Sequence, residues 1–177
     1  LDDVPKQVQT TLAEAPKPKP SWAENTTLSG RMYFTISNIN QKSSGVRVAP
    51  SGTGFDLKRF YLGVDHKFSD IYSANLTTDV QYSSAISSTH LFIKKAYLQA
   101  KYSDLVTIRL GAADTPWIPY AESLYGYRHI EQTLSDRTRF GTSAEWGVHA
   151  LGNVGPHVSY AVSVVNGAGF RTPFRSD

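Results

Sequence analysis

Residues 60–82, FYLGVDHKFSDIYSANLTTDVQY, set the fold class of this chain. Apolar and polar residues alternate with a period of two on both halves of the stretch, which is the pattern of half-buried β-strands. Only Ser69, Asp70 and Ile71 separate the two halves. A connection this short predicts that the two strands pair as an antiparallel hairpin.

The same alternation recurs along most of the chain. It predicts seven strands, at residues 28–39, 59–68, 72–82, 92–102, 106–111, 144–150 and 159–164. The connections between them are alternately long and short, as in an up-and-down meander with tight turns at one end and long loops at the other. In the fourth strand we place Phe92 on the apolar face, together with Ala96 and Leu98.

The apolar faces end in aromatic residues, and the polar faces carry charges as well as hydroxyl groups. Phe68, Tyr72 and Tyr102 lie at the tight-turn end, and Tyr82 and Phe92 lie at the long-loop end. A transmembrane β-barrel has an apolar band toward lipid, aromatic girdles at both interfaces and a wet lumen. The pattern therefore predicts an all-β fold, an antiparallel up-and-down transmembrane β-barrel.

A soluble barrel of the lipocalin type is the alternative fold, because alternation alone does not say which face is inside. Such a barrel would turn the apolar faces inward, and its aromatic residues would have no reason to collect at both rims. Some outer-membrane barrels are hydrolases, so an enzyme is also an alternative. No G-x-S-x-G nucleophile turn occurs in the sequence, and we expect the protein not to be an enzyme.

Composition excludes several other classes. The 18 Lys and Arg residues against 15 Asp and Glu give a net charge of +3, too small to indicate a nucleic-acid partner. There is no cysteine, so disulfides and thiolate metal sites are excluded. The histidines at 66, 129, 149 and 157 lack metal-binding spacing, so we expect no metal or cofactor. No apolar run approaches the roughly 18 residues of a transmembrane helix, whereas a barrel strand needs only about 9–11.

Residues 1–26 differ from the rest of the chain. Val4, Val8 and Leu12 are four residues apart, as at the end of a short helix, and prolines at positions 16, 18 and 20 alternate with lysines. This composition predicts a periplasmic tail or linker, with residues 27–177 in the barrel. Because the chain starts at Leu1 without a signal peptide, we expect a mature or truncated protein.

The alternation stops over residues 111–142, GAADTPWIPYAESLYGYRHIEQTLSDRTRFGT. A structureless loop of this length is uncommon in a compact domain and is usually functional. We expect the loop to fold inward and narrow the lumen. Its constriction residues would be Trp117, Tyr120, Glu122, Tyr125, Arg128, Glu131, Asp136, Arg137 and Arg139. Trp117 has two candidate roles, stacking on a sugar or anchoring the loop, and anchoring is the more frequent one.

Four segments resemble the N-terminal half of Gram-negative outer-membrane porins: GFDLKRFYLGVDHKFSD (54–70), LFIKKAYLQAKYSD (91–104), DTPWIPYAESLYGYR (114–128) and SYAVSVVNGAGF (159–170). The similarity is greatest to the phosphate-selective porin O and P type family and extends over residues 28–177. It implies a barrel of about sixteen strands, commonly a homotrimer, whose third long loop enters the pore. Seven strands cannot close such a barrel, so we expect the sequence to be an N-terminal fragment.

The polar strand faces supply the candidate pore lining, which is Arg31, Arg59, Asp65, Lys67, Asp79, Lys95, Lys101 and Arg109. Glu145 lies on the same face of the sixth strand. Pairing Tyr72 with Tyr102 would bring Asp79 opposite Lys95, and the turn at residues 103–105 would bring Gln99 opposite Arg109. A phosphate channel concentrates Arg and Lys along its path, whereas this face mixes both signs with a mild cationic excess.

We therefore predict an outer-membrane porin, a passive diffusion channel for small hydrophilic solutes and ions that weakly prefers anions. A phosphate- or sugar-selective porin is the alternative, and a soluble ligand-binding β-barrel is the further one. The expected partners are outer-membrane lipid, small solutes or anions, and two further copies of the chain in a homotrimer. The expected location is the outer membrane of a Gram-negative bacterium.

Overall fold

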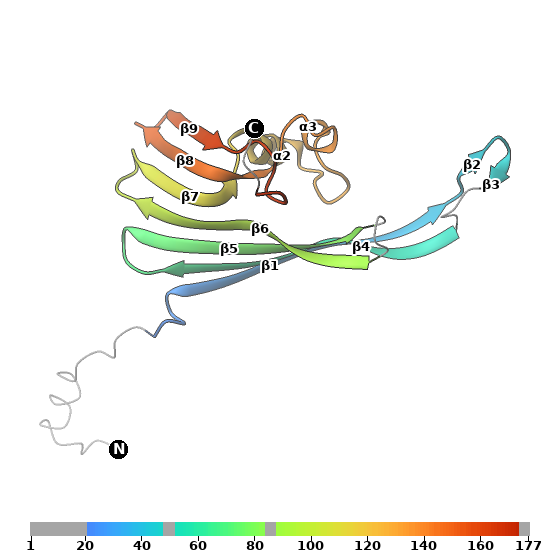
Figure 1. Cartoon of the computed structure of the whole chain (residues 1–177), viewed down its shortest axis with the longest axis horizontal. Coiled ribbons are helices and arrows are strands. Elements are labelled where there is room, and N and C mark those ends of the chain that lie inside the picture. Colours follow the sequence, from blue (N-terminus) through green and yellow to red (C-terminus); the bar gives the residue numbers. More distant parts are fainter. Residues whose placement is uncertain (1–20, 48–51, 84–87, 174–177) are drawn as a thin grey trace, which may run out of the picture.

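The computed structural model describes residues 21–47, 52–83 and 88–173, and its main feature is one curved antiparallel sheet (Figure 1). Strands make up 60% of the described residues and helices 9%, which confirms the all-β class. The seven strands follow one another in sheet order as β1 (Thr26–Ile39), β4 (Gly52–Lys67), β5 (Tyr72–Ser83), β6 (Ser88–Lys101), β7 (Thr107–Asp114), β8 (Ala144–Val154) and β9 (Val158–Val165). The sheet is not closed, and β1 and β9 form its two edges.

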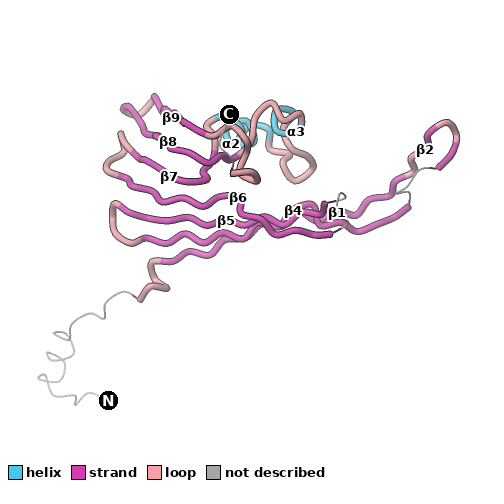
Figure 2. Tube along the Cα trace, in the orientation of Figure 1, coloured by secondary structure: helices cyan, strands magenta, loops and turns pink. Residues whose placement is uncertain are grey.

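The short turns lie together at one end of the sheet (Figure 2). The two predicted hairpins form, because the backbone N–H of Phe68 donates to the carbonyl of Tyr72 over 2.9 Å and that of Tyr102 donates to Val106 over 3.0 Å. The turn after β8 lies beside the second of them, where Asn153 N donates to the carbonyl of Asp104 over 2.9 Å. The predicted meander is therefore correct in order and direction.

At the end opposite the short turns, the paired strands β1 and β4 extend well beyond the other strands (Figure 1). The second strand is longer than the predicted 59–68, because β4 already begins at Gly52, which pairs with Ile39. A small hairpin, β2 (Lys42–Ser43) and β3 (Val46–Arg47), occupies part of the connection between β1 and β4. Gly45 allows its turn, since its φ of 80° is one that residues with a Cβ rarely adopt.

A β-bulge in β6 changes the predicted register. Thr77 pairs with Lys95 but Thr78 pairs with Ile93, so Lys94 is an extra residue on β6. A bulge reverses the alternation of faces beyond it. The placement of Phe92 with Ala96 on the apolar face is therefore wrong: its ring lies 6.0 Å from that of Phe170.

The two faces of the sheet differ in polarity. The apolar face is exposed and the polar face is covered, whereas a soluble barrel encloses its apolar face. Large apolar side chains on one face are exposed, among them Leu28 at 71%, Leu98 at 59% and Val164 at 74%. Charged side chains on the other face are buried, including Arg59 and Asp79. In the described part of the chain the buried apolar core is small: Ala112, Ala113, Ile118 and Ala144.

The segment after β7 is not structureless, which corrects the loop predicted for residues 111–142. β7 continues to Asp114, and two short helices follow, α2 (Trp117–Tyr125) and α3 (Leu134–Arg137). Gly126 ends α2 in the left-handed conformation at φ 73°, where its N–H donates to the carbonyl of Glu122 over 3.2 Å. Propensity within 117–125 supports a helix, because Ala, Glu and Leu are good helix formers.

The N-terminal tail is described only from Ser21, so the helix and proline linker predicted within residues 1–20 lie outside the described residues. The Thr26 hydroxyl donates to the carbonyl of Trp22 over 2.7 Å and fixes the turn that leads into β1. Neither described helix has the length and apolar character needed to cross a membrane.

Candidate functional site

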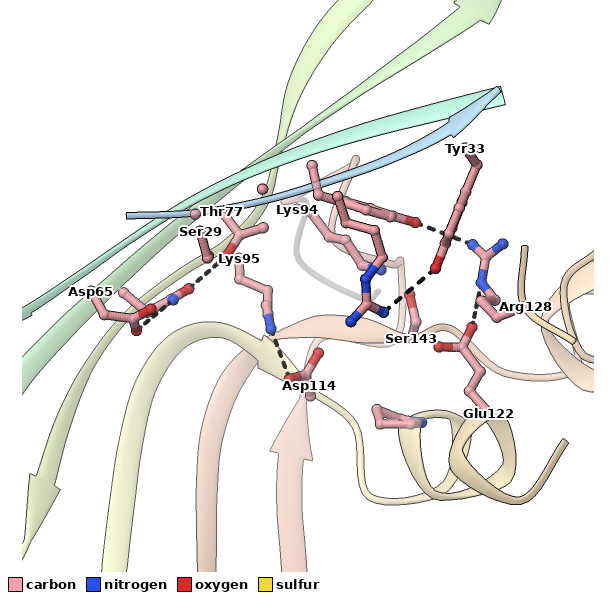
Figure 3. Close-up of a pocket in the computed structure, with 16 residues that line it drawn as sticks. Ser29, Tyr33, Asp65, Thr77, Lys94, Lys95, Asp114, Glu122, Arg128 and Ser143 are labelled. Atoms are coloured by element: carbon pink, nitrogen blue, oxygen red, sulfur yellow. Dashed lines mark hydrogen bonds and ion pairs between the residues drawn. The ribbon is translucent and has the colours of Figure 1, made fainter. Parts of the chain in front are cut away.

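A cavity of about 370 Å³ lies between the polar face of the sheet and the segment that follows β7 (Figure 3). Strands β1, β4, β5 and β6 form one wall, and α2 and the turn at Arg128 form the other. Four cations and three carboxylates line it: Arg31, Lys94, Lys95, Arg128, Asp65, Asp114 and Glu122. The remaining lining side chains are mostly hydroxyl-bearing or amide groups, so the cavity is polar and suited to hydrated solutes rather than to an apolar ligand.

Arg128 holds the 115–142 segment against the sheet. Its Nε donates to Glu122 Oε1 over 2.7 Å, and its Nη2 donates to the Tyr61 hydroxyl on β4 over 3.2 Å. The guanidinium also lies over the ring of Tyr33 on β1, 5.6 Å from its centre. A second tether is Lys58, whose Nζ donates to the carbonyl of Ile130 over 2.6 Å. The segment therefore crosses the polar face from β7 to β4 and β1, near the other edge of the described sheet.

Ile118 anchors the segment at its base. It is 1% exposed and is the largest fully buried apolar side chain of the described residues. Gly141 lies close beside it, since an added Cβ would stand 3.7 Å from Ile118 Cδ1. The two ends of the segment are joined where the Thr115 hydroxyl donates to the carbonyl of Thr142 over 2.5 Å.

Arg59 and Asp79 form a buried ion pair on the polar face, with side chains 10% and 0% exposed. The predicted pairing of Asp79 with Lys95 is wrong, because Tyr72 pairs with Ala100 and not with Tyr102, which sets Lys95 opposite Thr77. The bulge then places Phe92 opposite Asp79. Asp79 is instead matched by the cation on the preceding strand, since Tyr61 pairs with Asp79 and Arg59 lies two residues before Tyr61. Such a pair fixes the geometry of the wall, because either charge alone would be costly at this burial.

Lys95 and Arg109 lie further along the same wall. Lys95 Nζ lies 3.0 Å from Asp114 Oδ2 at the end of β7. The predicted pairing of Gln99 with Arg109 is confirmed, and Arg109 Nε donates to Gln99 Oε1 over 2.8 Å. Arg109 also lies over the Tyr97 ring, 4.9 Å from its centre. These contacts bring the two residues to the polar face.

The other predicted lining residues are less enclosed. Asp65 accepts a hydrogen bond from Asn75 Nδ2 over 2.8 Å and reaches the cavity. Lys67 is exposed at the tight-turn end of β4. Lys101 lies outside the cavity, 2.8 Å from Asp104 Oδ1, and this hydrogen bond and charge lower the pKa of the Asp104 carboxyl. Arg31 lines the cavity and donates weakly to the Tyr33 hydroxyl over 3.5 Å.

Of the nine predicted constriction residues, only Glu122 and Arg128 line the cavity. Asp136 accepts a hydrogen bond from Gln132 over 3.0 Å within the segment. The others are exposed on the segment: Trp117, Tyr120, Tyr125, Glu131, Arg137 and Arg139. Trp117 is 63% exposed, so it does not anchor the loop, and the anchoring role belongs to the neighbouring Ile118.

Sequence reasoning missed five residues of the site: Tyr33, Tyr61, Lys94, Asp114 and Ser143. Tyr33 and Tyr61 lie on the polar faces of their predicted strands, but we did not single them out because they are uncharged. Their rings meet edge to face at 6.0 Å and receive the Arg128 guanidinium. Strict alternation puts Lys94 on the apolar face. The two consecutive lysines, Lys94 and Lys95, within one strand were the available signal of a bulge.

A second segment folds over the polar face after β9. Trp146 Nε1 donates to the carbonyl of Phe170 over 2.9 Å, and Gly169 N donates to Glu145 Oε1 over 2.7 Å. The Arg171 guanidinium lies over the Phe92 ring, 4.3 Å from its centre, and hydrogen-bonds Gln81. This segment covers the part of β6 that the bulge turned inward.

His149 has structural partners. His149 is buried, 2.8 Å from the Ser163 hydroxyl and 3.2 Å from the carbonyl of Glu145. Over residues 21–47, 52–83 and 88–173, no group of three His, Asp or Glu side chains is placed to hold a metal ion. The site can therefore be described as a polar cavity with charges of both signs beneath a tethered cover. Searches of protein-family models and of curated proteins found no match to this chain.

Proposed function

We propose that the chain forms part of the barrel wall of an outer-membrane porin. The porin is a passive diffusion channel for small hydrophilic solutes and ions with a weak preference for anions. The seven strands would belong to an antiparallel barrel of about sixteen, because the sheet has two unpaired edges at β1 and β9 and barrels in membranes have none. The resemblance of residues 28–177 to the phosphate-selective porin O and P type family supports this proposal.

The polarity of the sheet is the observation that carries the proposal. Leu62, Leu76, Leu98 and Leu110 are 43–59% exposed on one face, while Arg59, Asp79 and Glu145 are buried on the other. Monomeric soluble proteins rarely expose a continuous apolar surface of this extent. An apolar outer band with a charged inner face is the arrangement of a transmembrane barrel.

The exposed aromatic residues at strand ends agree with this orientation. Phe68, Tyr72 and Tyr102 are 52–62% exposed at the tight-turn end, and Tyr82 is 52% exposed at the other. Aromatic side chains at these heights would form the two interfacial girdles. Phe92 does not contribute, since it faces inward against Phe170.

The tethered segment between β7 and β8 would be the constriction. Its contacts with Tyr61 and with Lys58 place it across the polar face, and the cavity beneath it would be part of the solute path. In a narrow passage with low-dielectric walls, lining charges act strongly on passing ions. The small excess of cations over carboxylates supports weak anion preference, and it does not favour a dedicated phosphate channel.

The test is conductance of the protein in planar lipid bilayers. The full-length protein that contains this chain, extracted with detergent from outer membranes, should form open channels with a reversal potential that indicates anion preference at low salt. Replacing residues 120–137 by a short Gly-Ser linker should raise the single-channel conductance, because this stretch carries Arg128 and its tethers. The matched control replaces residues 41–46 in the β2–β3 hairpin, which lie outside the cavity lining, and should leave conductance unchanged.

Two results would contradict the proposal. Extraction of the protein without detergent, together with no conductance, would favour a soluble β-sheet protein. Unchanged conductance after replacement of residues 120–137 would mean that the segment lies outside the solute path. The homotrimer is a separate part of the proposal, and cross-linking in outer membranes tests it.

A further inference from the structure

We infer that Lys94, the extra residue of the β6 bulge, is the side chain that sets the ion selectivity of the cavity. This inference rests on the proposed channel function and adds the residue responsible for its charge preference. Lys94 stands apart from the eight lining residues that alternation predicts, and the bulge alone brings it to the polar face.

The bulge places two consecutive lysines in one cavity. In a regular strand, adjacent side chains point to opposite faces. Here Thr77 pairs with Lys95 and Thr78 with Ile93, which leaves Lys94 without a partner across β5. As a result, both Lys94 and Lys95 line the cavity (Figure 3), and the exposed Ile93 keeps its place on the apolar face.

Two of the other cavity cations are neutralised by carboxylates. Lys95 lies 3.0 Å from Asp114, and Arg128 lies 2.7 Å from Glu122. Each pair presents a dipole rather than a net charge to a passing ion. The buried pair of Arg59 and Asp79 behaves in the same way next to the cavity.

The two remaining exposed charges, Arg31 and Asp65, have opposite signs. Both side chains reach bulk solvent as well as the cavity, so water and salt screen their fields. Their effects on a permeating ion therefore oppose each other and are weak. Lys94 remains as the cation without a counterpart.

Lys94 keeps its charge unpaired while being partly enclosed. Its Nζ lies 4.6 Å from the centre of the Tyr61 ring, and no carboxylate of the described residues lies within ion-pair distance of it. An aromatic ring stabilises a cation through its quadrupole but does not cancel the charge. Because the ammonium group is less exposed than Arg31, its field on a nearby anion is less screened.

The experiment uses the absence of cysteine from the chain. In the full-length protein, with any cysteine outside residues 1–177 replaced by serine, the Lys94→Cys variant carries one thiol per chain, so its charge can be changed by reagents within one bilayer. We expect the chloride-to-potassium permeability ratio of Lys94→Cys to fall at least about threefold below wild type in dilute KCl, because a unit charge about 5 Å from an ion contributes close to 1 kcal/mol even in water, which is about fivefold for that ion alone. Aminoethylation with a methanethiosulfonate should restore the ratio, and a neutral methyl reagent of the same class should not.

The matched control is the double variant Lys101→Gln, Asp104→Asn, which removes an exposed ion pair outside the cavity without changing net charge. Its permeability ratio should stay close to wild type. Equal ratios for wild type and Lys94→Cys would overturn the inference, as would a threefold fall in the control. A wild-type protein that forms no channels would refute the proposed function itself, whereas conducting channels with unchanged selectivity would refute only the role of Lys94.

Discussion

Substitution of Leu76 by arginine tests the orientation of the sheet most directly. Leu76 lies on β5, between Val64 of β4 and Ala96 of β6, and is 43% exposed. It follows Tyr72, the aromatic residue at the tight-turn end, by four positions. At about 3.3 Å per residue and a tilt near 40°, it lies about 10 Å above that rim, close to the middle of an apolar band about 25 Å tall.

The expected cost depends on whether that face meets lipid or water. Arginine at the midplane of a barrel destabilises it by about 2–4 kcal/mol, and the cost falls to about 0–1 kcal/mol near the interface. At an exposed position of a soluble protein, the same substitution changes stability by about 0.5 kcal/mol or less. Leu76→Arg should therefore lower the free energy of unfolding by about 2–4 kcal/mol if the face is lipid-exposed.

The assay is reversible guanidinium unfolding of the protein in lipid vesicles, followed by tryptophan fluorescence. The control is Ile71→Arg, in the turn at the rim, where Ile71 is 41% exposed and therefore matches Leu76 in solvent access. This control should cost less than about 1 kcal/mol. If both variants unfold at the wild-type guanidinium concentration, the apolar face does not lie in lipid and the barrel orientation is refuted.

Three further outcomes follow from the contacts of the described residues. Ile118→Ala should destabilise by about 2–4 kcal/mol in the same unfolding assay, because Ile118 is 1% exposed, and a loss below 1 kcal/mol would mean that the segment is anchored elsewhere. Asp79→Ala should cost about 3 kcal/mol by leaving Arg59 buried without its partner, and adding Arg59→Met should recover part of that loss. In intact cells a cysteine at Ser44 should react with an impermeant maleimide and one at Asp70 should not. The first residue lies in the β1–β4 connection and the second in the β4–β5 connection, at opposite ends of β4. Equal labelling would contradict the topology.

Local pattern was sufficient for the strands because side-chain polarity and strand geometry share a period of two. Residues 60–82 predict the hairpin that β4 and β5 form. The pairing of Gln99 on β6 with Arg109 on β7 followed from the length of the turn between them. The alternation located the loop segment correctly, but it did not predict the two helices within it. Nine residues of α2 are too few for a reliable periodic signal, and its buried residue, Ile118, lies beside Gly141, which is distant in the sequence.

The sequence by itself determined the all-β class, the meander order and which side of most strands is polar, since each of these depends on neighbours only a few residues apart. Tertiary structure alone decided the partners of the charges. The pairing of Tyr72 with Ala100 set Lys95 opposite Thr77, and one extra residue at Lys94 turned Phe92 inward opposite Asp79, because a shift by one position reverses every face beyond it. Lys95 and Asp114, 19 residues apart, meet because β6 and β7 are neighbouring strands, whereas Arg128 and Tyr61 are 67 residues apart. Only the folding of the segment after β7 onto the polar face brings both contacts to one cavity.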